Sequence, residues 1–196
     1  MNSLILVFSS LALAGSVPGD RAAWESLTTS PVPVECVTAA GEPWCRSTGL
    51  VLAPIAQVSQ ALEDMRHNAH LFDSVLRIDI LEGDAVHVVL DYPSPLDDRD
   101  YVARYTYTVE GDAHVFRWVS ELHPGAPITD EAVRLPAFAG EWRLEPRGEH
   151  TWVRYTWQAE INGSFPSFGY STARKRAGHE ALKDLANTQG AALSAP

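Results

Sequence analysis

The residues that decide the fold are YVARYTYTVEGDAHVFRWVSEL, positions 101–122. In the first half of this stretch, aromatic or small side chains occupy alternate positions, namely Tyr101, Ala103, Tyr105 and Tyr107. Successive side chains of a β-strand point to opposite faces, so the alternation predicts a strand over residues 101–110 with one apolar face. Gly111-Asp112 then indicates a turn, and residues 113–122 continue as a second strand. We therefore expect an antiparallel hairpin here.

Similar patterns extend outward from this hairpin in both directions. Strand composition recurs at residues 32–38, 44–52, 74–81, 85–92, 132–145 and 150–161. Short connections favour antiparallel pairing between neighbours, so most of these segments are expected to form one long meander. The same alternation along the other predicted strands adds a second group of side chains to the apolar face: Phe116, Trp118, Trp142, Tyr155 and Trp157. Further candidates for that face are Leu76, Ile78, Ile80, Val86, Val88 and Leu90.

Two segments predict helices. In PIAQVSQALEDM, residues 54–65, Pro54 takes the first helical position and apolar residues recur at helical spacing. Residues 167–188 have helix composition and carry three alanines on one face, Ala173, Ala177 and Ala181. Because a sheet with one apolar face must bury it, we expect the terminal helix to cover that face. The expected fold is α+β, a curved antiparallel β-sheet wrapped around a long C-terminal α-helix.

The composition limits the possible functions. The chain has 196 residues, a length typical of one domain. It carries 15 Lys and Arg against 25 Asp and Glu, a net charge of -10. Nucleic-acid binding requires a basic footprint, so we expect no nucleic-acid partner. An acidic surface favours a soluble monomer.

The N-terminus predicts export. Residues 4–14, LILVFSSLALA, form an apolar run that is too short to span a bilayer and ends in residues suited to signal-peptidase cleavage. We expect a signal peptide over residues 1–14, a polar tether over 15–30 and a folded domain over 31–190. A buried N-terminal helix is the alternative. Export would place the protein in the periplasm or outside the cell.

The two cysteines lie on either side of a turn. Cys36 and Cys45 belong to two strand-like runs joined by residues rich in Ala, Gly and Pro. If these runs pair as a hairpin, the side chains come within reach of a disulfide. Two free buried thiols are the alternative. The predicted export signal favours the disulfide, because disulfides persist in oxidising compartments.

The segment YPSPLDDRDYV, residues 92–102, resembles the strand-loop-strand motif of START domains. These domains are the lipid-transfer branch of the SRPBCC or Bet v 1-like helix-grip superfamily, and the segment is most similar to bacterial START-like and phosphatidylcholine-transfer proteins. Supporting matches, within a resemblance that covers residues 32–188, are Ala53-Pro54-Ile55, Ala132-Val133-Arg134 and Gly163-Ser164-Phe165-Pro166. Tyr105 stands where steroid-transfer members carry an arginine, which removes one charged anchor.

The resemblance implies a ligand held between the inner face of the sheet and the terminal helix. It also implies a gate formed by the 93–98 loop and that helix, with Arg99 and Asp100 as part of the structural motif. Combined with the strand phase, it gives these ligand-binding candidates: Tyr101, Ala103, Tyr105, Tyr107, Phe116, Trp118, Trp142, Tyr155, Trp157, Ala173, Ala177 and Ala181. The alternative is that these residues pack a solid core.

We therefore expect a protein that binds and carries a hydrophobic small molecule, a lipid. The alternative is an enzyme similar to the cyclases and hydratases of the same superfamily, with His87, His114 and Asp91 as acid-base candidates. The terminal helix also carries basic residues that could make transient contact with anionic lipid head groups, although a solvated helix face is the favoured explanation for them. These residues are Arg174, Lys175, Arg176 and Lys183.

No motif indicates a cofactor or a metal. The sequence has no nucleophile elbow, P-loop or dinucleotide fingerprint, and its histidines lack zinc-like spacing. The acidic cluster Asp97, Asp98 and Asp100 fits no calcium loop. For this cluster we expect turn formation and pairing with Arg99.

Overall fold

The computed structural model describes residues 16–65, 68–92, 94, 96–135, 137–159 and 169–195. Within these ranges the backbone forms one sheet in the strand order β1-β2-β3-β10-β9-β7-β6-β5-β4, with β11 beside β3 and β8 beside β6. All pairs are antiparallel except β6 with β8. The strands are β1 (Glu25–Thr28), β2 (Val34–Ala39), β3 (Glu42–Val51), β4 (Val75–Ile80), β5 (Ala85–Leu90), β6 (Arg99–Glu110), β7 (Ala113–Ser120), β8 (Val133–Arg134), β9 (Phe138–Arg147), β10 (His150–Ala159) and β11 (Leu193–Ser194). The α-helices are α1 (Ile55–Asp64) and α2 (Tyr170–Thr188), and two short 3-10 helices are η2 (Ala69–Leu71) and η3 (Glu82–Asp84).

The predicted hairpin is confirmed as β6 and β7. Tyr105 lies opposite Trp118 across this pair. The aromatic row then continues across the sheet, because Phe116 lies opposite Trp142 on β9 and Trp142 lies opposite Tyr155 on β10. Alternation along each strand therefore gathers the large rings of four neighbouring strands on one face, the inner face.

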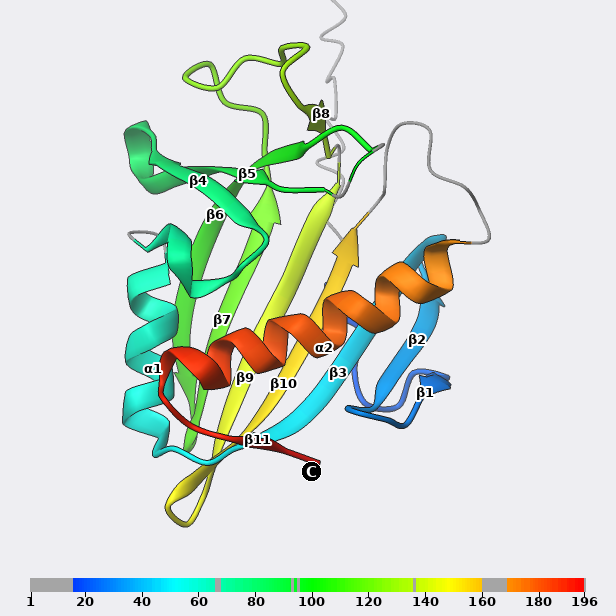
Figure 1. Ribbon diagram of the computed structural model, residues 1–196, viewed down its shortest axis with the longest axis vertical. Coiled ribbons are helices and arrows are strands. Elements are labelled where there is room, and N and C mark those ends of the chain that lie inside the picture. Colours follow the sequence, from blue (N-terminus) through cyan, green and yellow to red (C-terminus); the bar gives the residue numbers. More distant parts are fainter. Residues whose placement is uncertain are drawn as a thin grey trace, which may run out of the picture.

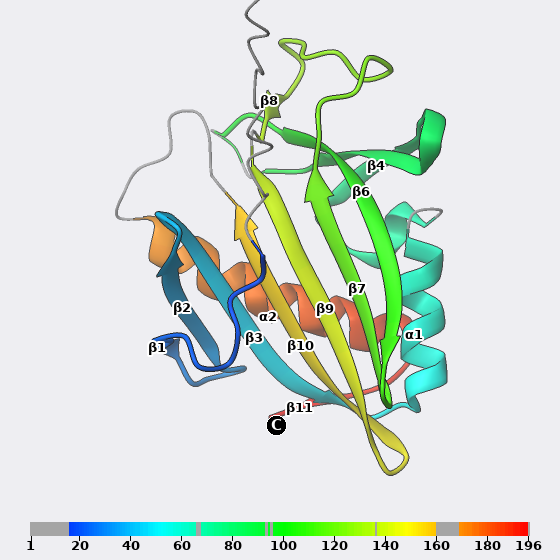
Figure 2. The same cartoon turned by 180° about the vertical axis from the view of Figure 1, so that it is seen from behind.

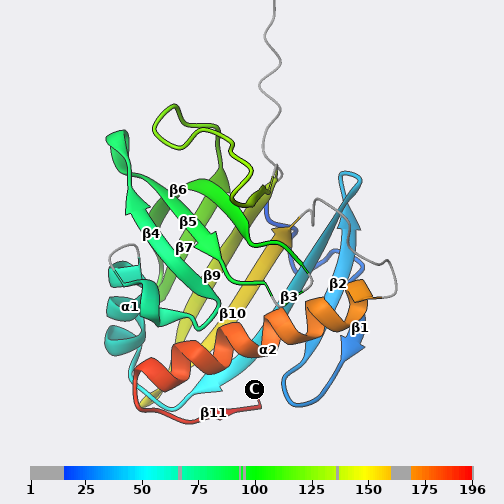
Figure 3. The same cartoon turned by 45° about the horizontal axis from the view of Figure 1, so that its top comes forward.

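The long helix α2 crosses the inner face, as expected. Figure 1 shows α2 in front of the sheet and Figure 2 shows it behind the sheet after a half turn. The sheet curves around the helix (Figure 3), and α1 packs against β9, β10 and α2. The structure therefore has the predicted architecture of a curved sheet closed by a terminal helix.

Gly178 allows α2 to lie directly on the strands. A Cβ atom at this position would come within 2.9 Å of the Trp157 ring and 3.0 Å of Val34. The hydroxyl of Ser47 donates to the Gly178 carbonyl at 3.1 Å, which ties the middle of the helix to β3. This close approach requires a residue without a side chain.

The inward side of α2 differs from the predicted alanine face. Its buried residues include Gly178, Leu182 and Leu185, whereas Ala177 is exposed. The prediction that Ala177 faces the interior is therefore wrong. Successive side chains of a helix differ in direction by about 100°. The row of residues that faces the sheet therefore begins at Gly178 and does not include Ala177. Ala173 and Ala181 are half-buried, and Ala181 packs against the core.

Other parts of the sheet also differ from expectation. Residues 25–28, expected in the tether, form β1 on the edge of β2, and β11 extends the sheet beyond residue 190. The segment 132–145 is divided into β8 and β9. A β-bulge between Val75 and Arg77 shifts the phase of β4, so Val75 and Ile78 pack on the core while Leu76 is exposed.

Some predicted features lie outside the described residues. These are the signal peptide over residues 1–14 and the motif at residues 163–166 before the terminal helix. In the described parts of the chain, no helix combines the length and apolar composition required to cross a membrane.

The predicted disulfide is present. Cys36 and Cys45 lie opposite each other on β2 and β3 and are joined by an S–S bond. The bond links the first long hairpin at one side of the sheet, where β2 has only the short β1 as its outer neighbour. It limits the number of conformations available to this hairpin in the unfolded chain.

The double variant Cys36→Ala/Cys45→Ala should lose about 2–3 kcal/mol of unfolding free energy, the loop-closure entropy of a short bridge. Urea denaturation followed by fluorescence measures the loss. Dithiothreitol should destabilise the wild type similarly and leave the double variant unaffected. Equal stability of the oxidised wild type and the variant would contradict the assignment.

Candidate ligand-binding site

A stack of aromatic rings covers the centre of the inner face. The Tyr155 ring lies 4.3 Å from Trp142 and 4.7 Å from Trp157, measured between ring centroids, and both contacts are stacked. Trp118 stacks on the same tyrosine at 5.8 Å. The rings belong to β7, β9 and β10, so the stack spans adjacent strands. Such a surface combines large apolar area with a few polar groups, as ligand sites do.

Two further tyrosines extend the stack toward β6. The hydroxyls of Tyr101 and Tyr105 lie 3.2 Å apart and share a hydrogen bond. The Tyr101 ring packs against Phe138 at 4.3 Å. The inner face therefore carries polar atoms as well as apolar rings.

Burial holds these tyrosines in the neutral form. It raises the pKa of Tyr105 to about 12 and raises the pKa of Tyr101 well above its usual value of 10.0. It also raises the pKa of Tyr155, an effect strengthened by the nearby hydroxyl groups of Tyr105 and Tyr92. All three side chains therefore remain protonated at neutral pH and can donate hydrogen bonds.

Most of the predicted ligand-binding residues lie on the inner face. Six are buried in the main core: Tyr101, Ala103, Phe116, Trp118, Trp142 and Trp157. Tyr105 and Tyr155 pack against that core but keep part of their surface accessible. A role in ligand binding stays a prediction for each of them.

Tyr107 lies at the far end of the row and is 44% exposed. Its ring stacks on Phe116 at 4.7 Å, and its hydroxyl lies 3.0 Å from Nδ1 of His114. The same nitrogen lies 2.7 Å from the hydroxyl of Ser59 on α1. The prediction that Tyr107 lies in the interior is wrong, because β6 extends beyond the part of the sheet that α2 covers.

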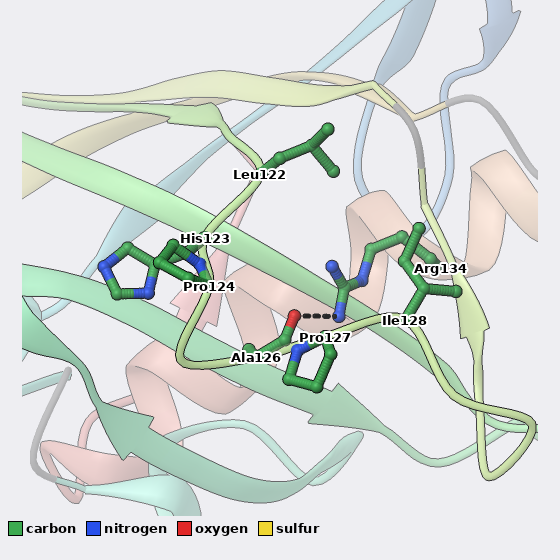
Figure 4. Close-up of a pocket in the computed structure, with 7 residues that line it drawn as sticks. All are labelled: Leu122, His123, Pro124, Ala126, Pro127, Ile128 and Arg134. Carbon is green, nitrogen blue, oxygen red and sulfur yellow. Dashed lines mark hydrogen bonds between the residues drawn. The ribbon is translucent and has the colours of Figure 1, made fainter.

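Two pockets occur elsewhere on the molecule. Figure 4 shows an open pocket of about 290 Å³ formed by the loop after β7, with Leu122 and Ile128 at its rim and Arg134 at its base. A second pocket of about 730 Å³ lies on the outer face beside Trp152, among charged side chains that include Arg143 and Arg154. Neither is the expected cavity between the sheet and α2, so the hollow interior stays a prediction.

A buried ion network on the outer side of β5 and β6 was not predicted. Arg134 makes two hydrogen bonds to the Asp100 carboxylate, at 2.9 and 2.7 Å, and one to the Ala126 carbonyl. Nε2 of His87 lies 2.7 Å from the same carboxylate. The network fastens the loop after β7 against the sheet. Asp100 and Arg134 are 34 residues apart along the chain, and no periodic pattern in the sequence connects them.

Arg99 and Asp100 are both largely buried, and the carboxylate of Asp100 pairs with Arg134. Neighbouring residues of a strand point to opposite faces, so Asp100 meets Arg134 while Arg99 turns the other way. The guanidinium of Arg99 lies 4.7 Å from the Tyr92 ring centre and donates to the Asp97 carbonyl. Asp98 accepts a hydrogen bond from the Tyr92 amide. The acidic cluster thus shapes the loop, as expected of a turn.

Comparisons with known proteins give two sequence relatives. The sequence matches no family model. It is 26% identical over 123 residues to the uncharacterized protein PA1579 of Pseudomonas aeruginosa, covering 60% of this chain and 61% of that protein. It is 31% identical over 80 residues to mouse mitochondrial StAR-related lipid transfer protein 7, covering 37% of this chain and 21% of that protein. The matches therefore span less than two thirds of either relative.

Solved structures identify the fold. A STAR-related lipid transfer protein fragment of Xanthomonas axonopodis matches with a TM-score of 0.74 and 22% identity, over 85% of this chain and 98% of that one. Human StAR-related lipid transfer protein 5 gives a TM-score of 0.78 at 15% identity, over 87% and 88%. The Zhui aromatase/cyclase of Streptomyces gives 0.53 at 17%, over 75% and 93%. The chain has the helix-grip fold of START domains.

The ion network makes the free energy of unfolding depend on pH. Burial alone would raise the pKa of Asp100, but hydrogen bonds from Arg134 and His87 lower it below 3.8. A carboxyl whose pKa is lowered by folding stabilises the fold above its unfolded pKa and loses this effect as pH falls. Asp100→Asn should lose about 3–5 kcal/mol at pH 7, because Arg134 stays buried without its carboxylate.

Urea denaturation between pH 7 and pH 3 tests this expectation. The wild type should lose stability below about pH 4, and the decline should be shallower for Asp100→Asn. Asp112→Asn, in the exposed turn after β6, serves as the control and should follow the wild type. An Asp100→Asn variant as stable as the wild type at pH 7 would contradict the assigned network.

Proposed function

We propose that the protein binds and carries a hydrophobic small molecule, a lipid, between the inner face of the sheet and α2. The observation that carries this proposal concerns Tyr105 and Tyr155. Burial raises the pKa of both side chains, yet each keeps part of its surface accessible on the inner face. A ligand-binding site needs side chains of this kind, which are surrounded by protein but still have surface that a ligand can contact. The lipid-transfer proteins with the same fold support this function.

Burial of the ligand supplies the driving force. Enclosing about 400 Å² of apolar surface at roughly 25 cal/mol per Å² gives on the order of 10 kcal/mol before the costs of association. This free energy can offset what the same apolar surface loses on leaving a membrane, so the exchange requires no energy source. Motion of the gate would then set the rate of exchange.

The distribution of contacts along α2 supports a gate at its N-terminal end. Every buried residue of the helix lies between Gly178 and Ala186, and residues 170–177 are exposed or half-buried. The C-terminal part is held further by Asp184, which accepts a hydrogen bond from the Asp73 amide, and by β11 on β3. Among the described residues, opening at the N-terminal end therefore exposes the fewest buried side chains of α2. Pro93 and Pro95 of the predicted gate loop lie outside the described residues.

The enzyme alternative has weaker support. His87 is bonded to Asp100 in the network outside the inner face, and Asp91 is exposed. His114 is engaged by Ser59 and Tyr107 at the far end of β6. These three candidates therefore stand apart from the tyrosines of the inner face, although a cyclase shares the fold. Conversion of a bound molecule during incubation would favour catalysis over carriage.

Membrane contact and export complete the proposal. Lys175, Arg176 and Lys183 are exposed on α2, where cations could contact anionic head groups. The disulfide supports maturation in an oxidising compartment, the periplasm or the exterior.

The double variant Lys175→Glu/Lys183→Glu should weaken binding to vesicles of 30% phosphatidylglycerol in phosphatidylcholine by about thirtyfold or more in a co-sedimentation assay, because two cations at about 1 kcal/mol each are lost. Pure phosphatidylcholine vesicles are the control, and binding to them should be weak for both proteins. Unchanged co-sedimentation of the variant would exclude α2 as the membrane-contacting surface.

Two alanine positions on α2 test the cavity itself. Ala181→Trp should fill space against the core and reduce the lipid that co-purifies by at least about fivefold, whereas Ala177→Trp, on the exposed side of the same helix, should not. Native mass spectrometry of the purified protein measures the bound fraction, and circular dichroism verifies that both variants fold. Equal retention in the two variants, or no bound lipid in the wild type, would reject the proposal.

A further inference from the structure

A cluster of hydrogen-bond donors lies within the aromatic inner face. We call it the phenol-indole cluster, and its members are Tyr92, Tyr101, Tyr105, Tyr155 and Trp118. The hydroxyls of Tyr101 and Tyr105 are 3.2 Å apart, and the Tyr155 hydroxyl is close enough to those of Tyr105 and Tyr92 to be influenced electrostatically by both. Trp118 joins the cluster through its contacts with Tyr105 and Tyr155, at 6.2 and 5.8 Å between ring centroids.

Two donors of the cluster are left without a partner within the described residues. Nε1 of Trp118 is buried and makes no hydrogen bond, although Trp118 itself is only 3% exposed. The hydroxyl of Tyr155 has no hydrogen-bond partner among the described residues either but, unlike Nε1 of Trp118, it is not a buried atom and stays accessible. Buried polar groups normally have partners, and an indole N–H can only donate. The cluster therefore has capacity for an acceptor.

The surroundings favour an acceptor without charge. The members of the cluster are uncharged at neutral pH, because burial keeps the phenols protonated. Burying an anion requires a cation that can pair with it. The neighbouring cation, Arg99, lies on the Tyr92 ring and donates to the Asp97 carbonyl, so it is engaged in the loop before β6.

We propose that the ligand presents a neutral hydrogen-bond acceptor, such as a ketone or ester oxygen, to the Tyr155 hydroxyl and the Trp118 indole N–H. This inference rests on the proposed function, because it places the acceptor in the same interior site. The apolar remainder of the ligand lies against the rings of Trp142 and Trp157, which continue the stack on either side of Tyr155. The cluster thereby selects among hydrophobic molecules by their polar group.

Four probes that share a ten-carbon chain test the chemistry of the polar group: decane, 2-decanone, decanoate and decyltrimethylammonium. Quenching of tryptophan fluorescence measures their binding to the delipidated full chain, and native mass spectrometry counts the bound molecules. 2-Decanone should bind about tenfold more tightly than decane and more tightly than either ion. Tyr155→Phe and Trp118→Phe should each weaken 2-decanone binding by about three- to tenfold more than they weaken decane binding. Trp152→Phe, on the outer face, is the matched control and should behave as the wild type.

The outcomes separate the two proposals. If decane binds but 2-decanone binds no better, or if an ion binds most tightly, the neutral-acceptor inference is overturned and the carrier function stands. If the two inner variants weaken decane and 2-decanone equally, the side chains act only by packing and the inference fails. If none of the probes binds and no lipid is retained, the proposed function and this inference fail together.

Discussion

The aromatic side chains that strand alternation places on one face of the sheet cannot remain in water. Trp118, Trp142 and Tyr155 stand on three adjacent strands and form a continuous stack, and only an apolar layer can cover such a surface. The helix α2 supplies that layer, and Gly178 lets it approach the rings closely. The curvature of the sheet, the position of the helix and the location of the candidate site all follow from this one requirement.

The sheet was predictable because its signal is local. Alternation over residues 101–110 fixes the face of each side chain in β6, and the short turn fixes the pairing with β7. The bulge in β4 shows the limit of this reasoning, because one extra residue reverses the phase and exposes Leu76. The edge strand β1 was missed because a short polar segment becomes a strand only when a neighbour offers its free edge.

The helix face and the ion network depended on contacts that sequence patterns do not encode. Alanine spacing identified a stripe on α2, but the stripe that packs begins one residue later, where absence of a side chain matters more than apolar character. The pairing of Asp100 with Arg134 joins β6 to β8, two strands far apart in the sequence, and no sequence pattern pointed to it. In the candidate site, the aromatic residues were predictable from phase, whereas the unpartnered donor of Trp118 was visible only in three dimensions.

Because α2 is buried mainly through its C-terminal half, a small rotation of the helix would move its N-terminal end the most. Its buried contacts end at Gly178, and its firmest attachment is near Leu185, 15 residues from Tyr170 or about 22 Å at the rise of an α-helix. A rotation of about 10° around that attachment would move the N-terminal end by about 4 Å, roughly the width of a hydrocarbon chain. Displacement grows in proportion to the distance from the pivot, so a passage could open at one end of the helix while the packing near Leu182 and Leu185 remains almost undisturbed.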